Sequence, residues 1–196
     1  MTGGRPIESP LLVVDIGGGS SEIVVVEPDG SVSAGHLPLG ANRLTQELVR
    51  TDPPTLAEID ALRARIRGIV ADLPDLHPGE IVAVGGTASN LLKLLPATAI
   101  DRMLTRRRIT VALAMLTVER SAEAASRHLI RPERARILPA GALIVDALLE
   151  RFAAERLYVS EEGIRSGLLL ATAAAGPAWR DRLPRLAGGW FEAPLD

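Results

Sequence analysis

The first forty residues alternate short apolar runs with turns, a pattern that predicts three consecutive β-strands. Residues 11–16 and 22–27 are short, apolar and rich in β-branched side chains, as expected of buried strands. The stretch 27–31, "EPDGS", places Pro, Asp and Gly where turns favour them. Residues 31–38 then predict a third strand. Such short connections between successive strands favour an antiparallel meander.

In residues 39–70 the apolar side chains recur at the spacing of helices. Residues 39–50 predict a helix that ends before a proline pair. A second helix follows, with Thr55 as its N-cap and Glu58 three residues later to complete a capping box. Its apolar side chains recur at the helical period: Leu56, Ile59, Leu62, Ile66, Ile69 and Val70.

Strands then alternate with helices to the end of the pattern. Two short apolar runs predict strands, at 80–86 and 156–160. Helices are expected at 87–95, 133–154 and 161–175, and one or two further helices over 109–130. An opening meander followed by this alternation predicts an α/β domain with a mixed sheet and helices on both of its faces.

The predicted elements divide the chain into three parts. Residues 1–10 are expected to be an N-terminal extension and residues 11–175 the folded domain. Residues 176–196 are rich in Gly and Pro and predict a loosely held tail.

Composition narrows the function classes. The chain has 196 residues, a formal net charge of −2 and no cysteine, which excludes disulfides, thiolate metal sites and a cysteine nucleophile. The near-neutral balance predicts neither a nucleic-acid partner nor a membrane surface. No apolar run reaches the roughly 18 residues of a membrane span, and no signal-peptide core is present near Met1. A cytoplasmic protein is therefore expected.

The stretch "LLVVDIGGGSSEIVVV" carries the clearest chemical signal. Gly17, Gly18 and Gly19 expose successive backbone N–H groups that can form an anion-binding nest, and Ser20 and Ser21 add hydroxyl donors.

The carboxylates of Asp15 and Glu22 flank this turn. They would repel a phosphate unless a cation such as Mg²⁺ lay between them, and one of them can instead orient or deprotonate a water. The alternative interpretation is a glycine-rich hairpin with two solvated acids.

A second glycine pair follows a later strand. Gly85 and Gly86 lead into a helix at Thr87, an arrangement that directs backbone N–H groups and a helix dipole at an anion. The alternative is a tight strand-to-helix turn capped by Thr87. The sequence contains neither a P-loop motif nor a dinucleotide-binding fingerprint.

Five blocks in order carry a family resemblance: "VVDIGGGSSE", "LPLGANRLT", "AVGGTASNL", "ERARILPAGALIVDALLE" and "VSEEGIRSGLLLA". Together they resemble the second half of the exopolyphosphatase / guanosine-pentaphosphate phosphohydrolase (Ppx/GppA) family. The resemblance implies a ribonuclease-H-like domain of the actin–hexokinase–Hsp70 superfamily.

The same resemblance implies a Mg²⁺-dependent hydrolase that removes terminal phosphate from polyphosphate or guanosine pentaphosphate. The glycine turn and the pair Gly85 and Gly86 would hold phosphate. Asp15 and Glu22 would serve the metal and the attacking water. Where the family commonly has Thr, this chain has Ser21, which keeps a hydroxyl.

Family members place two such domains across one cleft, and the resemblance covers only the second. The chain is therefore expected to need a first-domain partner or to form a homodimer. A non-catalytic phosphate- or nucleotide-binding regulatory module, derived from the enzyme, is the alternative function.

Other polar residues give weaker signals. Arg102, Arg106, Arg107 and Arg108 could grip polyphosphate, since Arg suits phosphate well, but a solvated helix start is the favoured interpretation. The three histidines, His36, His77 and His128, lack metal-ligand spacing and are predicted to be non-catalytic.

Overall fold

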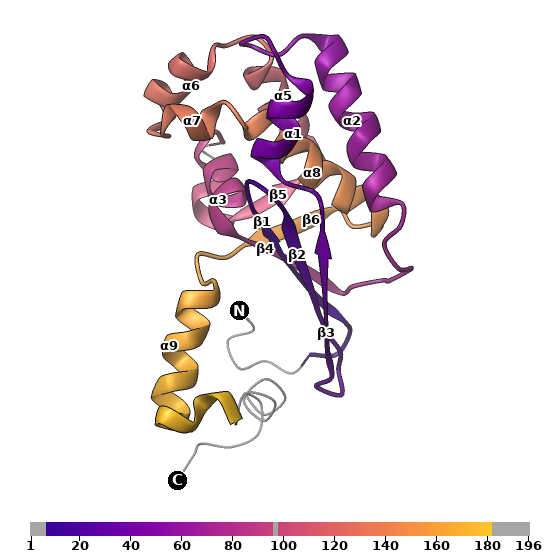
Figure 1. Cartoon of the computed structure of the whole chain (residues 1–196), viewed down its shortest axis with the longest axis vertical. Coiled ribbons are helices and arrows are strands. Elements are labelled where there is room, and N and C mark those ends of the chain that lie inside the picture. The colour runs from indigo at the N-terminus through magenta and orange to yellow at the C-terminus, as the bar shows by residue number, and fades with distance from the viewer. Residues whose placement is uncertain (1–6, 96–97, 182–196) are drawn as a thin grey trace.

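The computed structural model describes residues 7–95 and 98–181. Within them one six-stranded sheet has the strand order β3-β2-β1-β4-β6-β5 (Figure 1). Its strands are β1 (Leu11–Ile16), β2 (Ser21–Val26), β3 (Val32–Leu37), β4 (Glu80–Val84), β5 (Met103–Thr105) and β6 (Arg156–Val159).

The sheet is mixed, as predicted. β1, β2 and β3 pair antiparallel in sequence order, which confirms the meander. β4 pairs parallel with both β1 and β6, and β5 closes the far edge antiparallel to β6. The carboxyl ends of β1 and β4 therefore lie at the same edge of the sheet, because the two strands run in one direction.

Nine α-helices and one short 3₁₀ helix are found among the described residues. The α-helices are α1 (Ala41–Leu48), α2 (Leu56–Val70), α3 (Gly85–Lys93), α4 (Thr98–Asp101), α5 (Arg106–Leu116), α6 (Ser121–His128), α7 (Pro132–Ala135), α8 (Leu138–Arg151) and α9 (Ile164–Ala175). The 3₁₀ helix is η1 (Gly176–Ala178).

Helix α8 is the centre of the helix layer. Almost every residue from Leu138 to Leu149 is buried, since α8 packs against α1, α2, α3 and α5. Gly141 allows α8 to approach α3 closely, because a Cβ there would lie 2.3 Å from Thr87 Cγ2 of α3. The position of α3 is therefore set by its packing against α8.

The two faces of the sheet are covered differently. Leu12, Val14 and Ile16 of β1 point into the main core beneath the helix layer. The intervening Leu11 belongs to a small second cluster on the opposite face, with Val82 and Val84. Figure 1 shows α9 on that side, apart from the main helix layer. The predicted fold class of a mixed sheet with helices is confirmed.

Several local predictions differ from the structure. The strand predicted over 80–86 ends at Val84, and the helix predicted to open at Thr87 begins at Gly85. The helix predicted over 133–154 is two helices, α7 and α8, and Pro139 lies in the first turn of α8, where its missing N–H costs nothing. The short strand β5 was not predicted, because three residues are too few for a periodic signal. None of the helices of residues 7–95 and 98–181 has the length and apolarity to cross a membrane.

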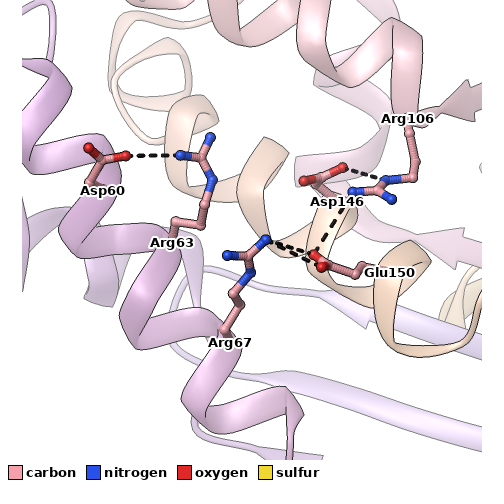
Figure 2. Close-up of polar contacts among 6 residues, drawn as sticks. All are labelled: Asp60, Arg63, Arg67, Arg106, Asp146 and Glu150. Atoms are coloured by element: carbon pink, nitrogen blue, oxygen red, sulfur yellow. Dashed lines mark hydrogen bonds and ion pairs between the residues drawn. The ribbon is translucent and has the colours of Figure 1, made fainter.

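Ion pairs join three helices on the outer face of the layer (Figure 2). Arg67 of α2 donates to both carboxylate oxygens of Glu150 on α8, at 3.3 and 3.2 Å. Arg106 of α5 donates to Asp146 of α8 at 3.2 Å and lies 3.9 Å from Glu150. Exposed ion pairs contribute at most about 1 kcal/mol each, so burial of α8 remains the main stabilising term.

The predicted capping box of α2 is present. Glu58 N–H donates to the Thr55 hydroxyl at 3.3 Å, and Thr55 N–H donates back to the Glu58 carboxylate at 2.8 Å. The same carboxylate accepts from the Thr51 hydroxyl and from the N–H of Arg50. The Thr51 hydroxyl is the largest of these influences, and together they lower the pKa of Glu58 to about 2.

Glu58→Gln should destabilise the chain at pH 7. The carboxylate has a lower pKa in the folded state than its ordinary 4.5, so its contribution is complete above that value and disappears as the pH falls toward about 2. The difference in thermal midpoint between wild type and E58Q, measured by circular dichroism, should shrink over this window. A difference that did not change with pH would contradict the assignment. As a reference, Thr55→Ala should cost about 1 kcal/mol.

Candidate functional site

The two predicted carboxylates lie side by side. In the antiparallel register of β1 and β2, Asp15 is directly opposite Glu22. Residues opposite one another in a sheet point to the same face, so both side chains project from the face that the main helix layer leaves free. They flank the glycine turn at the carboxyl end of β1, which Figure 1 shows close to α3.

The glycine turn is anchored on the first turn of α1. Gly17 N–H donates to Ser20 O at 3.0 Å inside the turn, while Ala41 and Arg43 of α1 donate to the carbonyls of Gly17 and Gly18 at 3.1 and 3.0 Å. These bonds leave the carbonyls of Gly17 and Gly18 directed at α1.

Gly40 makes this anchoring possible. A Cβ at this position would lie 2.2 Å from Gly19 C and 2.4 Å from Gly18 O, both backbone atoms. Only glycine allows the turn to approach α1 this closely.

The two serines of the turn have different environments. The Ser20 hydroxyl donates to Glu22 Oε1 at 2.9 Å, so it holds one of the acids at the turn. Ser21 is fully buried and its hydroxyl donates to Leu39 O at 2.6 Å. Because strand residues alternate between faces, Ser21 lies on the opposite face from Glu22. The Ser21 hydroxyl is therefore engaged in packing β2 on the segment before α1, away from the acids.

Asp15 lies in a partly buried, negatively charged environment. Burial, followed by the charge of Glu22, raises the pKa of Asp15 above its ordinary value. Its Oδ1 atom lies against Gly85, where a Cβ would come within 2.3 Å. Gly85 also has a φ of +90°, so two independent constraints require glycine at this position. The acid and the start of α3 thus share one small space.

The start of α3 presents unsatisfied backbone N–H groups. Its N-cap is Val84, which has no side-chain acceptor, so the cap formed by Thr87 in the alternative interpretation is absent. Thr87 lies inside the helix, 2 % exposed, and its hydroxyl is buried without a hydrogen-bond partner among the described residues. Thr87 can therefore contribute its backbone N–H to this site, whereas its hydroxyl faces the core.

A residue that the sequence did not single out completes the site. Arg134 of α7 places its Nη1 atom 3.5 Å from the position of a Cβ on Gly86. The residue is far from Gly86 in sequence and belongs to the block "ERARILPAG", which contains two arginines, Arg134 and Arg136. Helix packing alone decides which of them reaches α3.

His36 lies beside the acids as well. It is opposite Glu22 in the β2–β3 register, and its Nε2 atom is 4.0 Å from Glu22 Oε1. Neither His77 nor His128 lies beside these carboxylates. The sequence could have indicated this position of His36. Both strands were predicted, and pairing them antiparallel across the short turn brings His36 opposite Glu22.

The arginine cluster has structural roles. Arg102 pairs with Glu161 at 3.1 Å, Arg106 with Asp146 at 3.2 Å, and Arg108 forms two hydrogen bonds with Asp101 at 2.8 and 2.7 Å. Arg106–Arg108 begin α5, in agreement with the favoured interpretation as a helix start. Three of the four arginines are thus already neutralised by carboxylates of the chain.

The carboxylates of the site suit a cation that brings most of its own ligands. No group of three or more His, Cys, Asp or Glu side chains that could hold a metal ion occurs within residues 7–95 and 98–181. Mg²⁺ commonly binds proteins through one or two carboxylates and completes its shell with waters and substrate phosphate. Asp15 and Glu22 fit this mode, because a cation between them would relieve their mutual repulsion, which adds to burial in raising the pKa of Asp15.

Comparison with known proteins identifies the family of the chain. The model of the Ppx/GppA phosphatase family matches residues 4–175. Exopolyphosphatase 2 of Mycobacterium tuberculosis is 32% identical over 181 residues, which cover 84% of this chain and 56% of that protein. A guanosine-5'-triphosphate,3'-diphosphate pyrophosphatase of Photobacterium profundum is 25% identical over 162 residues, 81% of this chain and 33% of that protein.

A solved structure of the same family shares the fold of this chain. The crystal structure of the Aquifex aeolicus member of the Ppx/GppA family superposes with a TM-score of 0.75 at 28% identity, covering 85% of this chain and 56% of that one. The chain thus spans about half the length of the M. tuberculosis and A. aeolicus relatives that it matches.

Gly40→Ala should destabilise the chain by about 2 kcal/mol or more, because the new methyl group overlaps backbone atoms of the glycine turn. Gly19→Ala is the matched control, since a Cβ there has no atom within 4 Å. Urea unfolding of both variants tests this difference. Equal stabilities for the two would show that the turn does not pack on α1 as described.

Proposed function

Because the chain belongs to the Ppx/GppA phosphatase family, we propose that it forms one half of the active-site cleft of a phosphoanhydride hydrolase. The proposed reaction releases terminal phosphate from inorganic polyphosphate or from guanosine pentaphosphate. The observation that carries this proposal is the pairing of Asp15 with Glu22 at the mouth of a glycine turn, next to the N-terminus of α3. The names of the relatives from M. tuberculosis and P. profundum support the two substrate classes.

Phosphate would bind between the glycine turn and α3. The backbone N–H groups of Gly18 and Gly19 and those of the first turn of α3 are the proposed donors, because anions are stabilised at such positions. Arg134 would add a positive charge beside Gly86. Gly17 and Ser21 would shape the turn, since the Gly17 N–H and the Ser21 hydroxyl already donate to carbonyls of the chain.

The two acids would act on the attacking water. One carboxylate accepts a proton from the water or orients it toward the terminal phosphorus, and the bond to the bridging oxygen breaks as the new bond forms. Ser20 positions Glu22 for this role through its hydrogen bond. A bound Mg²⁺ would supply charge neutralisation for the phosphate oxygens, held by Asp15 and Glu22.

A second half would close the cleft. The acids lie on the sheet face that the main helix layer leaves free, whereas phosphoryl transfer depends on positioning and electrostatics in an enclosed site. We propose that a first-domain partner covers this face. Without it, the chain would bind phosphate compounds but turn them over slowly.

Arg134→Ala should weaken the Mg²⁺-dependent binding of pyrophosphate by roughly tenfold or more, since a hydrogen bond to a charged group contributes about 1.5–3 kcal/mol. Arg131→Ala is the matched control: Arg131 is at the start of the same helix and pairs with Glu133 on the exposed surface. Gly18→Val should abolish binding, because a Cβ there already lies 3.4 Å from Asn42 Cβ of α1 and the larger side chain would shift the turn with its proposed N–H donors. Isothermal titration calorimetry measures all three variants, and equal affinities for R134A and R131A would remove Arg134 from the site.

Asp15→Ala and Glu22→Ala should each lower phosphate release by roughly 10²–10⁴-fold in an active two-domain assembly, the usual effect of losing a positioned acid or base. The assembly can be made by grafting this chain onto the remaining segment of the M. tuberculosis relative. Asp29→Ala, in the distant β2–β3 turn, should leave the rate unchanged. Rates within a few-fold of wild type for D15A and E22A would refute the roles. Binding without any release by the wild-type assembly would favour a regulatory module instead.

A further inference from the structure

Within the described residues, β3 forms an open edge of the sheet. β3 pairs with β2 on one side only, over six continuous residue pairs without a bulge. Five of its six residues are exposed, from Val32 to His36. The strand contains no Asp, Glu, Lys, Arg or Pro. Long, flat and uncharged edges of this kind pair readily with another strand, because their backbone groups lack partners.

The hydrogen-bond register shows which groups face outward. Glu27 N–H donates to Ser31 O at 2.9 Å, so this pair bonds at the start of the β2–β3 ladder. Bonded and non-bonded pairs alternate along antiparallel strands. Ser33, Gly35 and Leu37 therefore bond to β2, and the N–H and C=O groups of Val32, Ala34 and His36 point away from the sheet.

The opposite edge of the same sheet is protected. β5 has only three residues, and side chains occupy the backbone of its first residue, Met103. Asp101 Oδ1 accepts from Met103 N–H at 3.0 Å, and Arg108 Nη1 donates to Met103 O at 2.8 Å. The described chain contains no such device at β3.

The exposed groups of β3 are complementary to themselves. Val32, Ala34 and His36 are evenly spaced about Ala34, so two antiparallel copies can pair Ala34 with Ala34 and Val32 with His36. Each of these pairs would exchange two backbone hydrogen bonds. The small side chains at the centre cause no clash, and no like charges oppose one another. Figure 1 shows the β2–β3 hairpin projecting beyond the helix layer, where a second hairpin can lie alongside it.

We infer that β3 is a self-association edge, through which two copies of this chain join their sheets antiparallel about Ala34. The occupant is a second copy because the edge supplies its own complementary pattern. This interface is separate from the sheet face proposed for the first domain, so it does not depend on the proposed function. It does lie beside the candidate site, since His36 is opposite Glu22.

Ala34→Pro tests the inference. Proline removes the central outward N–H and leaves the β2–β3 bonds in place, and edge strands tolerate proline at such positions. In sedimentation equilibrium, the wild type should approach twice its 20.8 kDa mass as concentration rises, whereas A34P should remain a monomer. Ala34→Ser, which keeps the N–H, should dimerise like the wild type. A wild type that stays monomeric, or an A34P variant that dimerises equally, overturns the inference.

Amide hydrogen exchange on the wild type keeps the inference testable if A34P does not fold. Dilution from dimer to monomer should raise the exchange rates of Val32, Ala34 and His36 by about tenfold or more, because their protection depends on the second copy. Ser33, Gly35 and Leu37 serve as internal controls and should not change. Dimerisation with an equal change at all six amides, or with none, would place the interface elsewhere.

Discussion

The antiparallel register of β1 and β2 sets Asp15 directly opposite Glu22, and the candidate site is arranged around these two like charges. Opposed like charges destabilise a sheet. The pKa of Asp15 is raised first by the partial burial of its carboxyl group and second by this repulsion. A chain that needed only a hairpin here would gain stability from neutral residues. The proposed cation would offset this repulsion, and it would also allow an anionic phosphate to approach the proposed N–H donors nearby.

Close backbone approaches fix the surroundings of the acids. Gly40 lets the glycine turn lie on α1, Gly85 lets the start of α3 lie against Asp15, and Gly141 lets α8 approach Thr87. These three contacts form a continuous path from the buried helix α8 to the acids. The acids therefore rest on packed elements, which suits the proposed phosphoryl transfer, since that chemistry depends on positioning.

Some arginines of the chain form ion pairs that stabilise the fold, whereas Arg134 lies at the candidate site. Most arginines of the 102–108 cluster pair with carboxylates and stabilise the junction of β5, α5 and α8, and Arg108 also occupies the backbone of the β5 edge. Arg134 instead lies beside Gly86 at the start of α3. The sheet thus has one edge covered by ion pairs and one edge, β3, with open backbone groups. The amino-acid composition cannot distinguish the arginines in ion pairs from Arg134.

The sequence by itself determined the meander, the capping box of α2, the strand before Gly85 and the acids that flank the glycine turn. These features depend on local periodicity, turn chemistry and spacing of a few residues, which a linear pattern contains. Only the tertiary structure decided that Ser21 faces the core, that α3 begins at Gly85, that three residues form β5 and that Arg134 reaches Gly86. Each of these depends on which face a side chain occupies or on the packing of helices far apart in sequence, and such long-range contacts leave no periodic signal in the chain.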